Sequence, residues 1–354
     1  MERRVKWIRG EGAAKCPGRV VVAGHGLRRG RFGRDVGLVR TLSERGLCLD
    51  SATRLTRGTQ PLQNALLAYL MPTSGSPTLI WKEDGHQAFG QLKHRAGEER
   101  ARALFIAPGW SIEPSGWLAL VDQLAVEAGS RGGHNLLAEV DESSPEFEAL
   151  RISGFAIYAR QSIWRLDHDL APTAPALPLR HAAKDDGPNT LALYNDIVPR
   201  LVQQVEPTPE AGRGYVLERG NDLVAHLAVR RGPLGIWVDP VVHPEAYDLA
   251  DEIMSSALHF LTTSNRAGRP VYVNVRRYQD WLQEPLRVSG FEKVASQAVM
   301  VKRLAVRVAE PALKPIPAIV GRTTRPVAQL ERLGAPGSLG DERVLPRMSR
   351  IDPN

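Results

Sequence analysis

The sequence predicts an α/β protein, of the mixed kind also classed as α+β, made of two copies of one unit. Residues 150–155 (LRISGF) return as residues 286–291 (LRVSGF). The patterns that predict strands and helices follow the same order before each copy, and a proline-rich segment separates the two runs. A repeat of this length indicates one supersecondary unit that is used twice.

Each copy of the repeated stretch is typical of a helix that stops and a strand that starts. In the first copy, Leu150 lies on the apolar face of a short helix that begins near Ser144. Gly154 can take the left-handed conformation that ends a helix. We expect Phe155 to fill the core and Arg151 to face solvent or an acidic neighbour. We expect the same of their counterparts in the second copy.

The elements before each copy are predicted from apolar alternation and from helical spacing. The first half is expected to contain a hairpin over 78–81 and 87–93, a strand over 103–106, a helix between 117 and 128, and a strand over 135–140. The second half is expected to contain a hairpin over 215–218 and 223–229, a strand over 234–238, a helix between 249 and 261, and a strand over 271–275. A further strand and helical region precede each hairpin.

Domain boundaries follow from composition. We place an N-terminal domain at 35–167 and a C-terminal domain at 179–306, joined by a proline-rich linker over 168–178. Residues 1–34 form a basic head and residues 307–354 form a proline-rich tail. Both ends are poor in the apolar pattern that a packed domain needs, so we expect them to be disordered.

The net charge of +7 belongs to the ends of the chain rather than to its body. Residues 1–34 carry ten Lys/Arg against two Asp/Glu, and residues 308–354 carry seven against five, which leaves −3 between them. A basic arm can bind phosphate groups. A disordered basic head is the simpler interpretation, so nucleic acid is not expected as a partner.

Several function classes lack their signals in the sequence. No apolar run is long enough to span a membrane, and the N-terminus lacks the apolar segment of a secretory signal. The two cysteines, Cys16 and Cys48, form no disulfide framework, which predicts a cytoplasmic protein. Residues 24–30 (GHGLRRG) resemble a dinucleotide loop, but more glycines follow where its helix should begin. The dispersed histidines predict no metal site.

The order of the elements, with a short helix that ends in Ser-Gly-Phe before a strand in each half, resembles the GNAT superfamily of N-acetyltransferases. The resemblance covers residues 35–306. It implies two tandem GNAT-like domains, each with a mixed, strongly bent sheet flanked by helices. It also implies that acetyl-CoA lies where two neighbouring strands splay apart, with its pyrophosphate at the N-terminus of the helix that follows.

The resemblance places the candidate cofactor residues in the first half. Ile106, Ala107 and Pro108 end the strand whose amides would polarise the thioester carbonyl. Ser115 and Gly116 begin the helix whose free amides would bind the pyrophosphate. The first half is therefore the expected acetyl-CoA site.

The second half departs further from the family. The family's basic residue and glycines are replaced there by four other residues, Tyr247, Asp248, Ala250 and Glu252. Carboxylates at this position would repel a diphosphate. In both halves the position of the family's general-acid tyrosine holds a leucine, Leu150 or Leu286, which cannot transfer a proton.

Candidate general bases lie near the ends of predicted strands. They are Glu139 and Asp141 in the first half and Asp239 in the second, and Glu83 and His243 are further candidates. Each of them is more simply explained as a solvated or turn residue.

Two functions are consistent with these observations. The first is a CoA-dependent acyltransferase, with at most one active half, that moves an acetyl group to an amine of a small molecule or peptide. The second is a catalytically inactive GNAT-like protein that binds a ligand or partner in its clefts. The sequence holds no signature of a particular acceptor and does not fix the oligomeric state.

Overall fold

The computed structural model describes residues 27–30, 32–71, 76–95, 97–167, 175–263, 265 and 268–304. We call residues 27–167 the N-terminal half and residues 175–304 the C-terminal half. The expectations for residues 1–26, for most of the linker and for the tail lie outside the described residues.

The N-terminal half begins with two short strands and three helices. They are β1 (Arg28–Arg29), α1 (Phe32–Ser43), β2 (Leu47–Cys48), α2 (Ser51–Arg57) and α3 (Pro61–Leu70). The predicted hairpin, strands and helices follow as β3 (Thr78–Glu83), β4 (His86–His94), β5 (Arg100–Ala107), α4 (Pro114–Ser130), β6 (Asn135–Asp141), α5 (Pro145–Ile152) and β7 (Ala156–Leu166).

The C-terminal half repeats the order of strands from its hairpin onward, and its described residues hold no counterpart of β2. Its first part holds β8 (Arg180–His181), η1 (Lys184–Asp186), α6 (Gly187–Ile197) and α7 (Arg200–Gln203). The second part holds the predicted hairpin and the elements after it, which are β9 (Tyr215–Arg219), β10 (Asp222–Arg231), β11 (Ile236–Val242), η2 (Pro244–Leu249), α8 (Ala250–Thr263), β12 (Val271–Arg276), η3 (Arg277–Leu282), α9 (Gln283–Val288) and β13 (Glu292–Arg303).

The repeated stretch forms the same corner twice, as predicted. Gly154 and Gly290 both have φ of 84°, in the left-handed region. The amide of Phe155 donates to the carbonyl of Leu150 at 3.0 Å, and the equivalent bond in the second copy measures 2.9 Å. Leu150 is fully buried and Phe155 is 5% exposed. Arg151 is exposed and pairs with Glu148, so both expectations for the first copy are confirmed.

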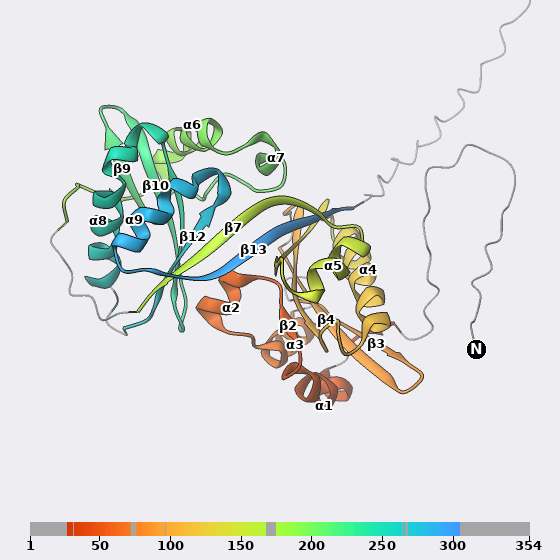
Figure 1. Ribbon diagram of the computed structural model, residues 1–354. Helices are drawn as coiled ribbons and strands as arrows, with labels where there is room; N and C mark the ends of the chain where they lie inside the picture. The colour runs from red at the N-terminus through yellow and green to blue at the C-terminus, as the bar shows by residue number, and fades with distance from the viewer. Residues whose placement is uncertain are drawn as a thin grey trace, which may run out of the picture. The chain divides into compact units, whose positions relative to one another are not determined.

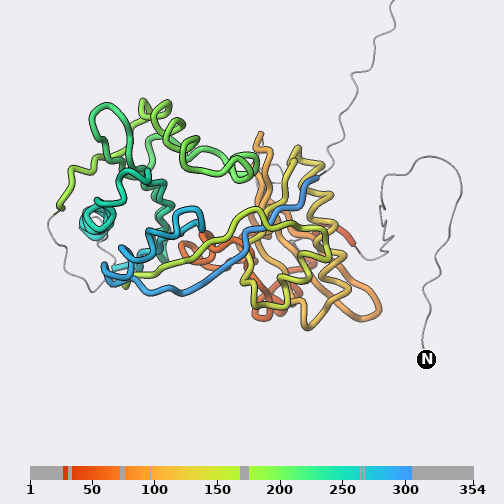
Figure 2. The backbone as a smooth tube through the Cα atoms, turned by 45° about the horizontal axis from the view of Figure 1, so that its top comes forward, coloured from red at the N-terminus to blue at the C-terminus, as the bar shows by residue number. Residues whose placement is uncertain are grey.

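The two halves exchange their last strands. The central part of the sheet has the order β6-β13-β7-β12, so each half's last strand pairs with a strand of the other half. β13 and β7 also pair with each other, antiparallel. Figures 1 and 2 show these two long strands side by side between the halves. Seen along the sheet, N- and C-terminal strands therefore alternate at the centre.

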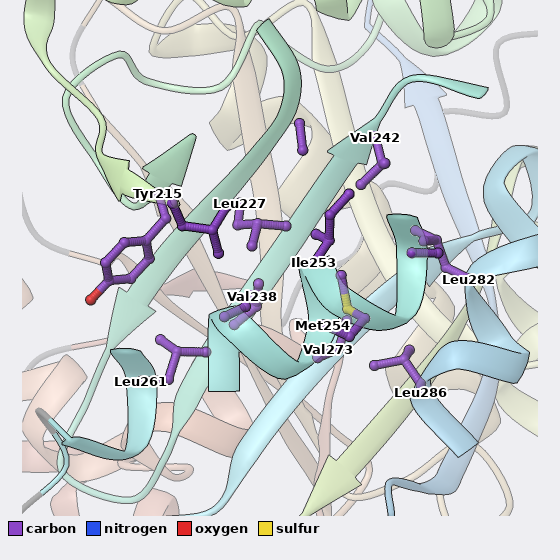
Figure 3. Packing of buried hydrophobic residues seen from close by; sticks show 14 of the residues in the cluster. Tyr215, Leu227, Val238, Val242, Ile253, Met254, Leu261, Val273, Leu282 and Leu286 are labelled. Carbon is purple, nitrogen blue, oxygen red and sulfur yellow. The ribbon is translucent and has the colours of Figure 1, made fainter. Parts of the chain in front are cut away.

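Apolar packing fixes the exchange. The core of the N-terminal half includes Ala298 and Met300 of β13, and the core of the C-terminal half includes Trp164 and Leu166 of β7. Figure 3 shows the core of the C-terminal half, where side chains of α8 point toward the strands of the sheet. Neither half can bury its core without the strand that the other half supplies.

The fold begins earlier than the predicted boundary at residue 35. β1 pairs with β3, with Arg28 opposite Ile80. The guanidinium of Arg28 lies 2.5 Å from Asp35, and that of Arg29 lies 2.9 Å from Glu127. These arginines, which the sequence assigned to a disordered head, therefore hold the edge of the sheet.

Within the described residues, no helix is both long and apolar enough to cross a membrane.

Candidate functional site

The strands splay apart in both halves where the resemblance places acetyl-CoA. β5 and β6 run parallel, and their pairing ends with Arg102 opposite Leu137. β11 and β12 also run parallel, and their pairing ends with Val238 opposite Val273. Beyond these points each pair of strands leaves backbone groups that need other partners.

In the N-terminal half the chain itself fills the splay. β2 pairs antiparallel with β5, with Leu47 opposite Ile106. The amide of Leu49 donates to the carbonyl of Leu104 at 3.0 Å, and the amide of Glu139 on β6 donates to the carbonyl of Leu49 at 2.9 Å. Residues 47–49 thus act as a strand between β5 and β6, and we call them the β2 segment. It uses the backbone groups that a pantetheine arm would need.

The β2 segment is tightly packed. Leu49 is 1% exposed. A Cβ atom on Gly46 would lie 2.2 Å from the ring of Phe105, so the chain approaches β5 too closely for any side chain there. Burial raises the pKa of the Cys48 thiol to about 12, which keeps it protonated at neutral pH. Leu49 is therefore buried like a core residue, while Leu47 and Cys48 are half-buried.

The start of α4 is also filled, by the carboxylate of Glu113. This carboxylate accepts hydrogen bonds from the Ser115 hydroxyl at 2.7 Å and from the Gly116 amide at 3.5 Å, and it lies 2.6 Å from Nδ1 of His86. Burial alone would raise the pKa of Glu113, but the bonds from Ser115 and His86 outweigh it and lower the pKa. A negative charge therefore already occupies the place where a pyrophosphate would bind.

The candidate cofactor residues do not form a cofactor cradle. Ile106 and Ala107 are fully buried, and the peptide between Ala107 and Pro108 is cis. The amide of Gly116 was expected to bind the pyrophosphate. Instead, a Cβ atom at this position would lie 2.5 Å from the Trp81 ring, so the glycine makes room for that ring. In this structure the residues of the first half therefore leave no open cradle for acetyl-CoA.

In the C-terminal half the side chain of Gln279 takes the place of a strand. Its Oε1 accepts from the amide of Val242 at 2.8 Å, and its Nε2 donates to the carbonyl of Pro240 at 3.1 Å. Gln279 is 1% exposed. The helix that follows β11 carries Asp251 and Glu252 in its first turn. The second half therefore does not fit acetyl-CoA either, for the electrostatic reason that the sequence indicated and because Gln279 covers the strand edge.

The candidate bases are held by other groups. Glu139 accepts from the amide of Ser51 at 2.9 Å and from Arg102 at 3.1 Å. Asp239 accepts from Arg230 at 2.6 Å and from Asn274 at 2.9 Å. Burial would raise the pKa of Asp239, but Arg230 and Asn274 outweigh it and lower the pKa. Asp239 is therefore a weak base, because its proton-free form is already stabilised.

The remaining candidates lie elsewhere. Asp141 accepts from the amide and hydroxyl of Ser143, and both bonds lower its pKa. It lines a separate hollow, with residues of β7 and β13. Glu83 is exposed at the tip of the first hairpin. His243 accepts from the amide of Glu245 at 3.2 Å and begins η2. Of Glu139, Asp141 and Asp239, the structure brings together only Glu139 and Asp239.

Glu139 and Asp239 line a cavity of about 330 Å³ whose walls come from both halves. This cavity also contains Arg276, which is 9% exposed and pairs with Glu206. Glu206 in turn accepts from the Tyr158 hydroxyl at 2.6 Å. Nη1 of Arg276 is buried and has no hydrogen-bond partner among the described residues.

A larger cavity of about 650 Å³ adjoins the first, and Arg102 and Arg230 line both. It lies between α2, β4 and β5 of one half and β10 of the other. Its lining is strongly basic and includes Arg57, Lys93, Arg100, Arg102 and Arg230. Sequence reasoning missed this cavity. The alternation of Arg100 and Arg102 was visible, but the position of β10 opposite β5 depends on the strand exchange.

Among the described residues, no group of three or more His, Cys, Asp and Glu side chains is arranged to hold a metal ion.

Comparisons with known proteins identify the fold. No protein-family model matches the sequence, and no curated protein matches it. The structure is similar to that of a GCN5-related N-acetyltransferase from Sphaerobacter thermophilus, with 13% identity and a TM-score of 0.50, over 78% of this chain and 95% of that chain. A tandem GNAT protein from the clavulanic acid biosynthesis pathway matches with 16% identity and a TM-score of 0.47, over 80% of this chain and 99% of that one. Together with the repeated order of elements, the first similarity shows that the chain has the fold of the GNAT superfamily, built as a tandem repeat.

Proposed function

We propose that this protein is a GNAT-fold binding protein that does not use acetyl-CoA as an acyl donor, and that its ligand site is the pair of cavities between the halves. One observation carries the proposal. Both strand edges at which the fold would hold acetyl-CoA are hydrogen-bonded to the chain itself, through the β2 segment in one half and Gln279 in the other.

The cost of opening the first splay supports this proposal. An incoming pantetheine arm could replace the hydrogen bonds of Leu49, but it would expose the buried leucine side chain and displace its backbone. Burying a leucine contributes about 1.5–3 kcal/mol, and each buried polar group left unpaired costs about 1–3 kcal/mol. A total on the order of 3 kcal/mol would weaken binding roughly a hundredfold.

The alternative is acyl transfer to an amine of a small molecule or peptide. The fold supports acyltransferases in general, and two carboxylates, Glu139 and Asp239, line one cavity. Transfer would require the β2 segment or Gln279 to move, and it would require one of these carboxylates to leave its arginine.

Thiol release from acetyl-CoA tests the proposal. The full chain is incubated with acetyl-CoA and a panel of amines that covers polyamines, amino acids and peptides, and free thiol is measured over time. We expect the uncatalysed rate for every amine. A rate that rises in proportion to protein concentration, and that the Asp239→Asn variant lacks, would establish an acyltransferase and overturn the proposal.

A further inference from the structure

The larger cavity concentrates positive charge in a body that has an excess of negative charge. The chain between residues 35 and 307 has a net charge of −3. Nevertheless the cavity is lined by several arginines and by Lys93, and Glu98 is the single carboxylate among the described residues that line it. The charge in the cavity is therefore a local feature and not the general character of the surface.

Buried carboxylates outside this cavity compensate only part of its charge. Lys93 lies 3.6 Å from Asp50, and Arg102 lies 3.1 Å from Glu139. Arg230 is paired with a carboxylate of β11. These three acids are absent from the lining of the larger cavity. They hold the cations in place from outside it, so the cavity itself remains positive.

Arg57 and Arg100 have no such partner. Within the described part of the chain, neither makes an ion pair. Arg100 is half-buried, and its side chain lies on the same face of β5 as that of Arg102, two residues further on. Burial and the neighbouring Arg102 both lower the pKa of Arg100, which means that its positive charge is unfavourable there. An anion in the cavity would relieve this cost.

The adjoining cavity supplies a second, independent sign of a ligand. Nη1 of Arg276 and Oδ1 of Asn274 are both buried without a hydrogen-bond partner in the described structure. Arg276 and Asn274 are 9% and 5% exposed, and both line the smaller cavity. Buried polar atoms are normally paired, so one donor and one acceptor are left for a ligand or for water.

We propose that the two cavities bind one small molecule that carries at least two phosphate groups, with the phosphates in the larger cavity and an uncharged polar part in the smaller. This inference rests on the proposed function, because it uses the same site. A guanidinium group can donate two parallel hydrogen bonds to the oxygens of one phosphate. A chain of phosphates can therefore bind several arginines at once. Volumes of about 650 and 330 Å³ are those of small-molecule sites. Walls from both halves favour a small molecule over a polymer.

Calorimetric titration of tripolyphosphate into the full chain tests the phosphate part. The variant is Arg100→Gln, and the matched control is Arg151→Gln, an exposed arginine on α5 outside both cavities. We expect binding to the unmodified chain, about tenfold or more weaker for Arg100→Gln, as for the loss of one charged hydrogen-bond pair, and unchanged for Arg151→Gln. Affinity should fall as salt rises.

The basic head could bind tripolyphosphate as well, and the comparison of variants separates the two sites. Binding that Arg100→Gln leaves unchanged belongs to the head and overturns the inference, as does an absence of binding. Arg57→Gln, an exposed position on α2, gives the same test in a variant with little effect on folding. A titration with citrate tests whether the cavity prefers a carboxylate anion to a phosphate anion. Tighter binding of citrate than of tripolyphosphate would overturn the inference that the ligand carries phosphates.

The outcome is distinguishable from that of the proposed function. Thiol release from acetyl-CoA together with tripolyphosphate binding would overturn the proposed function and keep the anion site. No thiol release and no tripolyphosphate binding would leave the proposed function and remove this inference.

Discussion

Replacing Gln279 with leucine should destabilise the C-terminal half. The side chain is 1% exposed and hydrogen-bonds the carbonyl of Pro240 and the amide of Val242. Leucine has a similar volume but leaves both backbone groups buried and unpaired. Each costs about 1–3 kcal/mol, so we expect a loss of about 2–6 kcal/mol in the free energy of unfolding.

The assay is urea unfolding followed by circular dichroism, with Gln283→Leu as the matched control. Gln283 is a half-buried glutamine on α9, and its amide donates to Asp280. Its replacement should change the free energy of unfolding by no more than about 0.5 kcal/mol. If Gln279→Leu costs no more than Gln283→Leu, the Gln279 side chain neither holds the edge of β11 nor fills the second splay.

Two more predictions concern the first half. Gly46→Ala should destabilise the chain by about 1–3 kcal/mol, because the added Cβ atom would lie 2.2 Å from the ring of Phe105. Its control is Gly37→Ala on α1, where the added Cβ atom meets open space, and this change should be neutral or stabilising. Thermal unfolding of both variants checks the prediction, and equal melting temperatures would contradict it. Glu113→Gln tests the pH dependence. The pKa of Glu113 is lowered in the folded chain, so its stabilising effect is present above the unfolded pKa of about 4.3 and is lost as pH falls through the folded value. Unfolding measured from about pH 6 to pH 3 should therefore show a steeper loss of stability for the unmodified chain than for Glu113→Gln, and parallel curves would contradict the assignment.

The repeated corner shows what the sequence could predict. Leu150, Gly154 and Phe155 each have one physical role that follows from residue type and spacing, and each takes that role in both copies. The two hairpins, the strands beside them and the long helices were predicted for the same reason. Their apolar periods are long enough to define a face. The GNAT fold followed from the order of these elements.

The filled splays could not be predicted, because they depend on contacts between distant parts of the chain. β2 is two residues long, too short for any periodicity, and it is defined by its pairing with β5, almost sixty residues later. Gly116 fitted the pattern of a phosphate-binding glycine, but the nearby ring of Trp81 decides its role. The basic cavity likewise needs β5 and β10 to face each other, which the exchange of β7 and β13 brings about.

The strand exchange also explains how two degenerate copies can stay folded together. β13 completes the sheet of the N-terminal half, and β7 completes that of the C-terminal half. A change that unfolds one half therefore removes a core strand from the other. The cavities between the halves are then held by the same strands that hold the cores.

Amide hydrogen exchange of the full chain, with and without an excess of acetyl-CoA, tests the central claim most directly. The amides to follow are those of Leu49 and Glu139, which donate to Leu104 and to Leu49 across the first splay. If the chain fills the splay, both amides should remain protected and their exchange should not change when acetyl-CoA is added. Faster exchange over the β2 segment together with slower exchange over residues 104–107 would mean that acetyl-CoA displaces the segment, and it would contradict the claim.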